Sequence, residues 1–88
     1  MVGPAPRRLS ELRNLGAASE RMLLAAGIRT PEQLDEVGAL EAYRRAVAAG
    51  GHPSLNFLWS LEAALLDLNW RDLPARRKAE LREAATGL

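Results

Sequence analysis

The sequence predicts an all-α fold, a compact five-helix domain. Apolar residues make up 48% of the chain and recur at the three- and four-residue spacing of helices. No run alternates cleanly between apolar and polar positions with β-branched or aromatic residues, so no sheet is expected. Glycine and proline interrupt the apolar segments at short intervals, which predicts short helices joined by tight turns.

Local capping signals place the helix ends. The expected elements are a first turn at residues 9–14 and helices at residues 17–26, 31–37, 39–49, 54–67 and from residue 74 onward. Gly27 follows a helix at the C′ position, where glycine readily adopts the left-handed conformation. Thr30 is placed to cap the next helix, with Pro31 at its first position and Gln33 where a capping box has glutamate or glutamine.

The helix at residues 54–67 is apolar almost all round, so it is expected at the centre of the domain. Each of its large side chains contributes about 1.5–3 kcal/mol when fully buried. Glu62 is the polar residue of most interest on this helix. If it is buried, it needs a donor such as Arg13, Arg44 or a backbone N–H, because an unpaired buried charge is costly. Alternatively, Glu62 marks an exposed strip that binds a partner.

Length and composition set the expected organisation. We expect residues 1–8, which contain two prolines and a glycine, to be a flexible lead-in, and residues 9–88 to form a single helical domain. The apolar run at residues 55–68 is too short and too polar to span a bilayer, and the N-terminus lacks the apolar block of a secretion signal. The absence of cysteine fits a reducing compartment. A cytoplasmic protein is therefore expected.

The sequence offers no set of residues that would catalyse a reaction. His52 is the single histidine, and it has neither a nucleophile nor an orienting partner at a recognisable spacing. Without cysteine or a close carboxylate pair, no metal site and no cofactor are expected. The chain is therefore expected to be a non-enzyme without a small-molecule substrate.

Charge argues against strong non-specific nucleic-acid binding. Twelve basic and 11 acidic residues give a formal net charge of +1, without the clear basic excess of such proteins. Any contact with duplex DNA is therefore expected to be weak.

The turn at Gly16 is the first candidate contact. A glycine here lets the amide groups of the following helix start approach a phosphate, with help from the helix dipole. The alternative is that Gly16 only permits a tight turn or a protein contact. Glu20, which follows closely, would repel phosphate.

Other candidates flank the two glycine turns. Arg13 and Asn14 could reach a DNA backbone, although Asn14 could instead cap the second helical segment. Gly27 and Arg29 form the second turn, and Arg29 is expected to be exposed.

The last helix holds the densest basic cluster, Arg76, Arg77 and Lys78. It is either a solvated helix face or an electrostatic contact for DNA. Aromatic residues at positions 43, 59 and 70 could form an exposed patch for a partner. The alternative is that the tryptophans cover a small core, with each indole N–H satisfied at the rim.

Two sets of motifs resemble known families. Residues 12–16 (LRNLG) with residues 26–34 (AGIRTPEQL) resemble the helix-hairpin-helix units of DNA repair proteins and of the carboxyl-terminal domain of the RNA polymerase α polypeptide. This resemblance implies a helix-hairpin-helix-like N-terminal half. Further motifs look like the C-terminal domain of the TfoX/Sxy regulators of bacterial DNA uptake competence: GALEAYR at 38–44, GHPSLNFL at 51–58, LEAAL at 61–65 and WRDLP at 70–74.

The TfoX/Sxy resemblance implies an all-helical, non-enzymatic domain that takes part in transcriptional control of competence genes. In that family the domain commonly follows an N-terminal α+β domain. The expected partners are a regulatory protein, the backbone of duplex DNA or both, and a homodimer is possible. The alternative is a protein-binding or oligomerisation domain with no nucleic-acid role, which the near-neutral charge favours. No membrane partner is expected.

Overall fold

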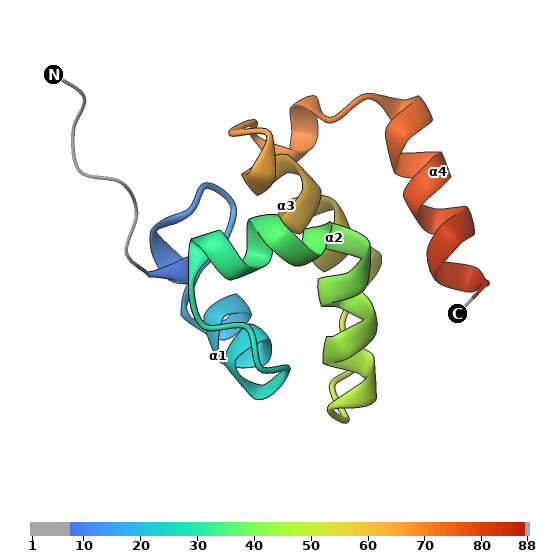
Figure 1. Ribbon diagram of the computed structural model, residues 1–88. Helices are drawn as coiled ribbons and strands as arrows, with labels where there is room; N and C mark the ends of the chain where they lie inside the picture. Colours follow the sequence, from blue (N-terminus) through green and yellow to red (C-terminus); the bar gives the residue numbers. More distant parts are fainter. Residues whose placement is uncertain (1–7, 88) are drawn as a thin grey trace, which may run out of the picture.

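The computed structural model describes residues 8–87. In this range the chain is helical throughout and contains no strand, which confirms the all-α class (Figure 1). The elements are η1 (Leu9–Glu11), α1 (Ala17–Ala25), α2 (Pro31–Ala48), α3 (Leu55–Leu65), η2 (Trp70–Asp72) and α4 (Ala75–Thr86). The predicted lead-in at residues 1–8 lies outside the described residues except for Arg8, which directly precedes η1.

The expected count of five helices is wrong, because there are four α-helices within residues 8–87. The helices expected at 31–37 and 39–49 form the two halves of α2, which bends at Gly38. Gly38 has φ +82° and ψ 165°, a conformation open essentially only to glycine. The predicted interruption at Gly38 is therefore present, but the chain resumes at once as the second half of α2, and Figure 1 shows the two halves running in different directions.

The turn between α1 and α2 forms as its sequence predicts. Gly27 has φ +84°, and the amide groups of Gly27 and Ile28 donate to the carbonyls of Leu24 and Leu23 at 3.0 and 2.9 Å. This is a Schellman motif, in which the buried Ile28 and Leu23 provide the accompanying apolar pair. The same arrangement ends α2 at Gly50, which has φ +91°.

The start of α2 is also confirmed. The hydroxyl of Thr30 accepts a hydrogen bond from the amide of Gln33 at 3.1 Å. The Gln33 side chain accepts from the amide of Arg29 at 2.7 Å, one residue earlier than in a standard capping box. The amide groups of Gln33 and Leu34 are thus bonded to Thr30.

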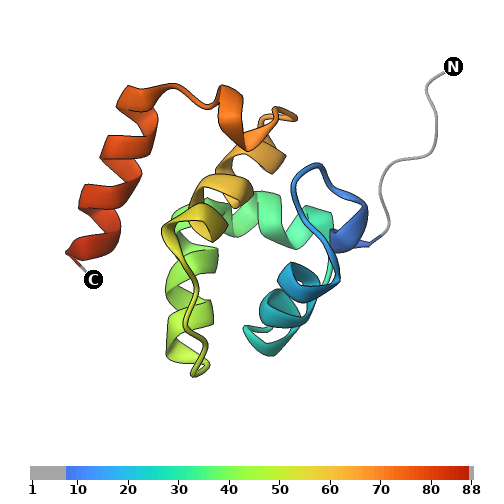
Figure 2. The ribbon, with the colours of Figure 1, turned by 180° about the vertical axis from the view of Figure 1, so that it is seen from behind.

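The core is centred on α3, as expected. Five of its side chains are buried, among them the fully buried Leu58 and Leu61. The helix packs against α2, η2 and α4, and Figure 2 shows it lying against α2. The buried contribution of α2 includes a row of alanines at positions 39, 42 and 46, which allow close helix packing. By contrast, α4 buries a single side chain, Leu81.

No helix within residues 8–87 combines the length and the hydropathy needed to cross a bilayer.

Candidate partner-binding surface

Gly16 is the N-cap residue of α1 and is exposed. Its φ of −124° is accessible to any residue, and a Cβ added here would meet no atom within 4 Å. No side chain caps the helix, and no hydrogen bond within residues 8–87 uses the amide groups of Ala17, Ala18 or Ser19. The N-terminus of α1 therefore presents free donors to solvent.

Gly27 is also exposed, but its chemistry differs from that of Gly16. Its amide is bonded to Leu24, and Thr30 accepts from the amide groups of Gln33 and Leu34 at the start of α2. Of the two glycine turns, the one at Gly16 is thus the turn with more open backbone donors.

Arg13 and Asn14 link the first loop to the chain after α3. Asn14, which has φ +72°, donates from Nδ2 to the carbonyl of Leu68 at 2.7 Å, and its Oδ1 accepts from the amide of Trp70 at 3.0 Å. Arg13 Nη1 donates to the carbonyl of Asp67 at 3.0 Å. Of the two roles considered for Asn14, the cap is not formed, because Gly16 is the N-cap of α1 and the Asn14 side chain bonds to Leu68 and Trp70.

The region near Gly16 has less net negative charge than the sequence indicates, because Glu20 is paired with a cation. The Glu20 carboxylate accepts from Arg8 Nη2 at 2.8 Å and from the amide of Ser10 at 3.3 Å. The hydrogen bond from Arg8 lowers the pKa of Glu20. Arg29 is exposed and its guanidinium has no partner within residues 8–87. Arg21 is exposed and unpaired in the same range, and the sequence analysis missed it.

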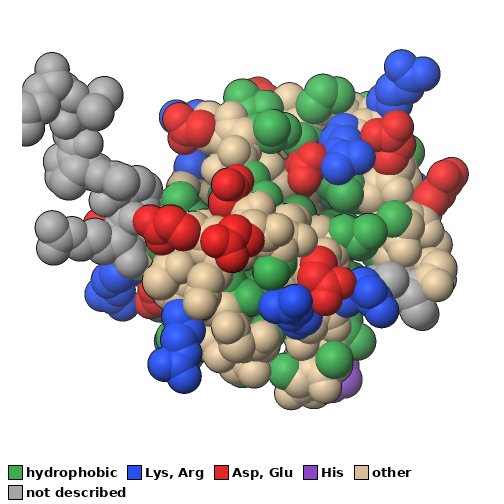
Figure 3. Space-filling model, in the orientation of Figure 1, with side chains coloured by type: hydrophobic (Ala, Val, Ile, Leu, Met, Phe, Trp, Pro, Cys, Tyr) green, Lys and Arg blue, Asp and Glu red, His purple; other side chains and the backbone are tan. Residues whose placement is uncertain are grey.

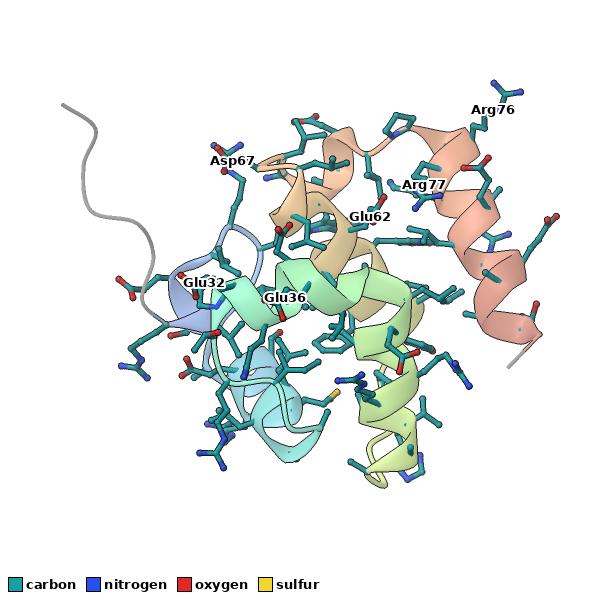
Figure 4. The ribbon with its side chains drawn as sticks, in the orientation of Figure 1. Glu32, Glu36, Glu62, Asp67, Arg76 and Arg77 are labelled. Carbon is teal, nitrogen blue, oxygen red and sulfur yellow. The ribbon has the colours of Figure 1, made fainter. Side chains whose placement is uncertain are left out.

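The cluster at residues 76–78 does not form one basic surface, as Figure 4 shows for its first two members. Arg76 points away from the domain and has no partner within residues 8–87. Arg77 Nε donates to Glu62 Oε2 at 2.7 Å, and Nη1 donates to Glu80 Oε1 at 3.4 Å. The bond to Glu62 raises the pKa of Arg77. The ammonium of Lys78 lies over an aromatic pair instead.

That pair consists of Trp59 and Trp70, whose ring centroids both lie 5.3 Å from Lys78 Nζ. Trp59 Nε1 donates to the carbonyl of Lys78 at 3.3 Å, which confirms the prediction of an indole satisfied at the rim. The Tyr43 hydroxyl donates to the carbonyl of Pro53 at 3.3 Å. All three aromatic residues are half-buried, so they cover the core and leave only part of each ring for a partner.

Glu62 is paired, but not with either arginine that the sequence analysis considered. Its side chain is 15% exposed and bonds to Arg77 of α4. Arg13 instead reaches Asp67, and Arg44 pairs with Glu41 at 3.2 Å. The pairing of Glu62 with Arg77 could not be predicted from the sequence, because it depends on how α4 packs against α3.

Residues 5–85 match the family model of the TfoX C-terminal domain. The chain belongs to this family. It is 35% identical over 74 residues to a Haemophilus influenzae protein named DNA transformation protein TfoX. The match covers 84% of this chain and 34% of that relative, so the chain spans about a third of its length.

Solved structures share the fold. Two crystal structures of Listeria monocytogenes proteins, one described as uncharacterized and one as of unknown function, are each 35% identical to the chain. Their TM-scores are 0.85 and 0.84. The first match covers 91% of both chains, and the second covers 90% of this chain and 98% of that one.

One face of this TfoX C-terminal domain is acidic. Glu32, Asp35 and Glu36 are exposed on the first half of α2, and Figure 3 shows acidic side chains gathered over this region. Glu32 and Glu36 are labelled there in Figure 4. No hydrogen bond or ion pair within residues 8–87 neutralises these three carboxylates, so this face would repel a phosphate backbone.

The outer face of α1 has a different character. Its exposed residues fall within about 120° of arc, since successive residues of a helix turn by about 100°. They are Ala17, Ala18, Arg21, Leu24 and Ala25. Leu24 is 47% exposed. A hollow of about 360 Å³ lies beside this face, lined by Ala18, Ser19, Met22, His52, Pro53, Ser54 and Phe57.

Residues 8–87 contain no group of three or more His, Cys, Asp or Glu side chains placed to hold a metal ion. The hollow beside α1 contains His52 without a carboxylate partner. The TfoX C-terminal domain thus presents contact surfaces of distinct charge: free amide donors and arginines around α1, and carboxylates on α2.

Proposed function

We propose that this TfoX C-terminal domain is a non-enzymatic regulatory module of the cytoplasm, which acts in transcriptional control of competence through a protein partner, the duplex DNA backbone or both. The family match over residues 5–85 is the observation that supports this proposal. The competence role in this proposal is supported by the name of the Haemophilus influenzae relative, a DNA transformation protein. The domain needs no cofactor for such a role, since binding alone suffices.

In the DNA form of the proposal, the backbone approaches the N-terminus of α1. The free amide groups after Gly16 and the positive end of the helix dipole favour an anion there. Arg21 and Arg29 add unpaired positive charge, and α1 with the Gly27 turn and the start of α2 acts as the helix-hairpin-helix-like unit. Binding is weak, because the carboxylates on α2 limit the approach.

The DNA form is tested by fluorescence anisotropy with labelled duplex DNA at several salt concentrations. If about four phosphates are neutralised, log affinity falls against log salt with a slope of about −3.6. An Arg21→Glu plus Arg29→Glu variant is expected to abolish binding. The control Arg76→Glu plus Arg82→Glu has the same charge change on α4, and it should bind as the natural chain does. A flat salt response, or equal loss in both variants, contradicts this form.

The protein-binding alternative is favoured by the outer face of α1. Exposed leucine and alanine with one arginine suit an apolar partner surface better than a phosphate backbone. Leu24 would be its central contact.

Sedimentation equilibrium at increasing concentration tests for self-association through this face. The control variant is Leu66→Glu, at a leucine that is 54% exposed at the end of α3. The alternative is supported if self-association is lost in Leu24→Glu and kept in Leu66→Glu. Monomeric behaviour at every concentration would rule out the oligomerisation form of it.

A further inference from the structure

The helix α4 is weakly stabilised by its own sequence. Pro74 occupies its N-cap and provides no side-chain hydrogen bond. Its first turn contains basic residues and no acidic one, so the charges oppose the helix dipole. An isolated helix of 12 residues is marginal in water even with favourable charges. The helix therefore depends on its contacts with α2 and α3.

The apolar part of those contacts is small. Leu81 is the single buried side chain of α4, and Ala85 is half-buried. Two hollows flank the helix where it faces α2. One, of about 460 Å³, is lined by Arg77 of α4 together with Val37 and Leu40, and the other, of about 300 Å³, includes Ala85. Little apolar surface is therefore buried between α4 and α2.

The remaining contacts of α4 depend on two cations. Arg77 is bonded to Glu62 at 2.7 Å. Lys78 lies between the rings of Trp59 and Trp70, and its carbonyl accepts from the indole of Trp59. Cation–π contacts contribute about 0.5–2 kcal/mol each, and ion pairs at the surface contribute less. Salt screens the charges of the ion pair, although less than those of a fully exposed pair.

Two extended residues precede the helix. Leu73 and Pro74 are extended, with φ and ψ of −65° and 128°, and −56° and 141°. Leu73 is buried, at 3% exposure, so the chain is fixed up to this residue. No backbone-to-backbone hydrogen bond within residues 8–87 joins α4 to the preceding helices. Movement of α4 at this point would thus break no backbone-to-backbone bond, but it would break the bond from Trp59 Nε1 to the carbonyl of Lys78.

We propose that α4 is a latch, which opens as a unit at Leu73–Pro74 while η1 to η2 stay folded. Opening releases Arg77 from Glu62 and Lys78 from the two tryptophans. Among residues 76–78, Arg76 is free of partners within residues 8–87 in both states, Lys78 becomes free on opening, and Arg77 keeps only its 3.4 Å contact with Glu80 of the same helix. Opening therefore frees two cations from their contacts with α3 and η2, whatever the domain binds.

Hydrogen exchange measured by mass spectrometry on the whole chain tests the latch. In the natural chain, the amide groups of α4 should exchange at least about tenfold faster than those of α3. Their exchange should depend less on denaturant than that of α3, because opening of α4 alone exposes less surface than global unfolding. In about 1 M salt, where the Debye length is about 3 Å, exchange in α4 should rise while that in α3 does not. The two tryptophans, which are the only ones in the chain, provide a parallel fluorescence signal from the latch.

Lys78→Met removes the charge and keeps an unbranched side chain. Exchange in α4 should rise about 2- to 30-fold, the range that follows from the cation–π contribution. Arg82→Met is the matched control, because Arg82 is exposed on the same helix without a partner within residues 8–87. Glu62→Gln, which weakens the other contact, is the second variant and should act in the same direction as Lys78→Met.

Two results would overturn the proposal. The first is a single opening free energy shared by α3 and α4 in the natural chain, because the helices would then unfold together. The second is exchange in α4 that is the same in Lys78→Met, Glu62→Gln and Arg82→Met.

Discussion

The helices α3 and α4 have nearly the same length, 11 and 12 residues, but they are stabilised by different interactions. In α3, the Ser54 hydroxyl caps the first turn by accepting from the amide of Phe57 at 3.3 Å, and five side chains are buried. In α4, no side chain caps the first turn, one side chain is buried, and two cations provide much of the attachment. Helix length thus says little about helix stability in this domain, because burial decides it.

The same cavity-creating change should separate the two helices. Leu58→Ala is expected to lower the free energy of unfolding by about 2–5 kcal/mol, because Leu58 is fully buried in α3. Leu81→Ala removes the same atoms at a site with 3% exposure, but its cost is limited to the docking energy of α4. Urea denaturation followed by circular dichroism measures both, and equal losses would show that α4 belongs to the same cooperative unit as α3.

Removing the cap of α3 gives the next effect. Ser54→Ala should destabilise the domain by about 1 kcal/mol, since the amide of Phe57 loses its acceptor. Ser54→Asp retains an acceptor and is the control, with stability expected near that of the natural chain. The midpoint of urea unfolding is the measurement. A loss in Ser54→Asp as large as in Ser54→Ala would show that the hydroxyl does not act as a cap.

A single substitution can make the charges in the first turn of α4 favour the helix dipole. Arg76→Glu places an acidic residue in the first turn, where it favours the helix dipole by about 0.3–1 kcal/mol. Arg76 has no partner within residues 8–87, so no contact is lost. Exchange in α4 should slow while that in α3 is unchanged. Arg82→Glu, in the later part of the same helix, should not slow it, and a similar slowing in both variants would contradict the dipole argument.

Acid should weaken the domain through residues outside both helices. Hydrogen bonds from Arg8 and Arg45 lower the pKa of Glu20 and of Glu41, respectively. A lowered pKa in the folded state stabilises the fold above the ordinary pKa of glutamate, about 4.3, and this stability is lost as pH falls through the folded-state pKa.

The effect of these two exposed pairs is expected to be the smallest of the four. Unfolding midpoints measured from pH 7 down to about pH 3 should fall below about pH 4.3. The fall should be shallower in Glu20→Gln than in Glu32→Gln, whose side chain has no partner within residues 8–87. Identical pH profiles for these two variants would mean that the Arg8 contact has no effect on stability.

The sequence predicted best the features that depend on neighbouring residues. The left-handed Gly27 and the Thr30 cap follow from rules that act over a few positions. The central place of α3 follows from its composition, because a helix that is apolar all round has no stable position at the surface.

Gly38 shows where such reasoning ends. A glycine that terminates a helix and a glycine that bends one have the same local sequence signature. Gly38 interrupts the helical backbone of α2 with φ +82° and ψ 165°, as a terminating glycine would. The second half nevertheless follows directly, and the direction it takes depends on tertiary packing that the local sequence does not contain.

The candidate contact residues divide in the same way. The exposure of Gly16 and Arg29 was predictable from turn chemistry. The partners of Asn14 and Lys78, and the Glu62 partner of Arg77, lie on other elements and were not predictable. For these residues, the side-chain type shows which kinds of bond are possible, but it does not identify the partner.

The two hydrogen bonds of Asn14 join positions 54 and 56 residues apart in the chain. Such a long ring costs more entropy to close than any single helix turn, so this junction should form late in folding, after α3 has met its neighbours. The two loops that Asn14 joins are therefore held in one register. Inserting a residue into either loop would displace the carboxamide from both of its backbone partners, and a compensating change would be needed in the other loop.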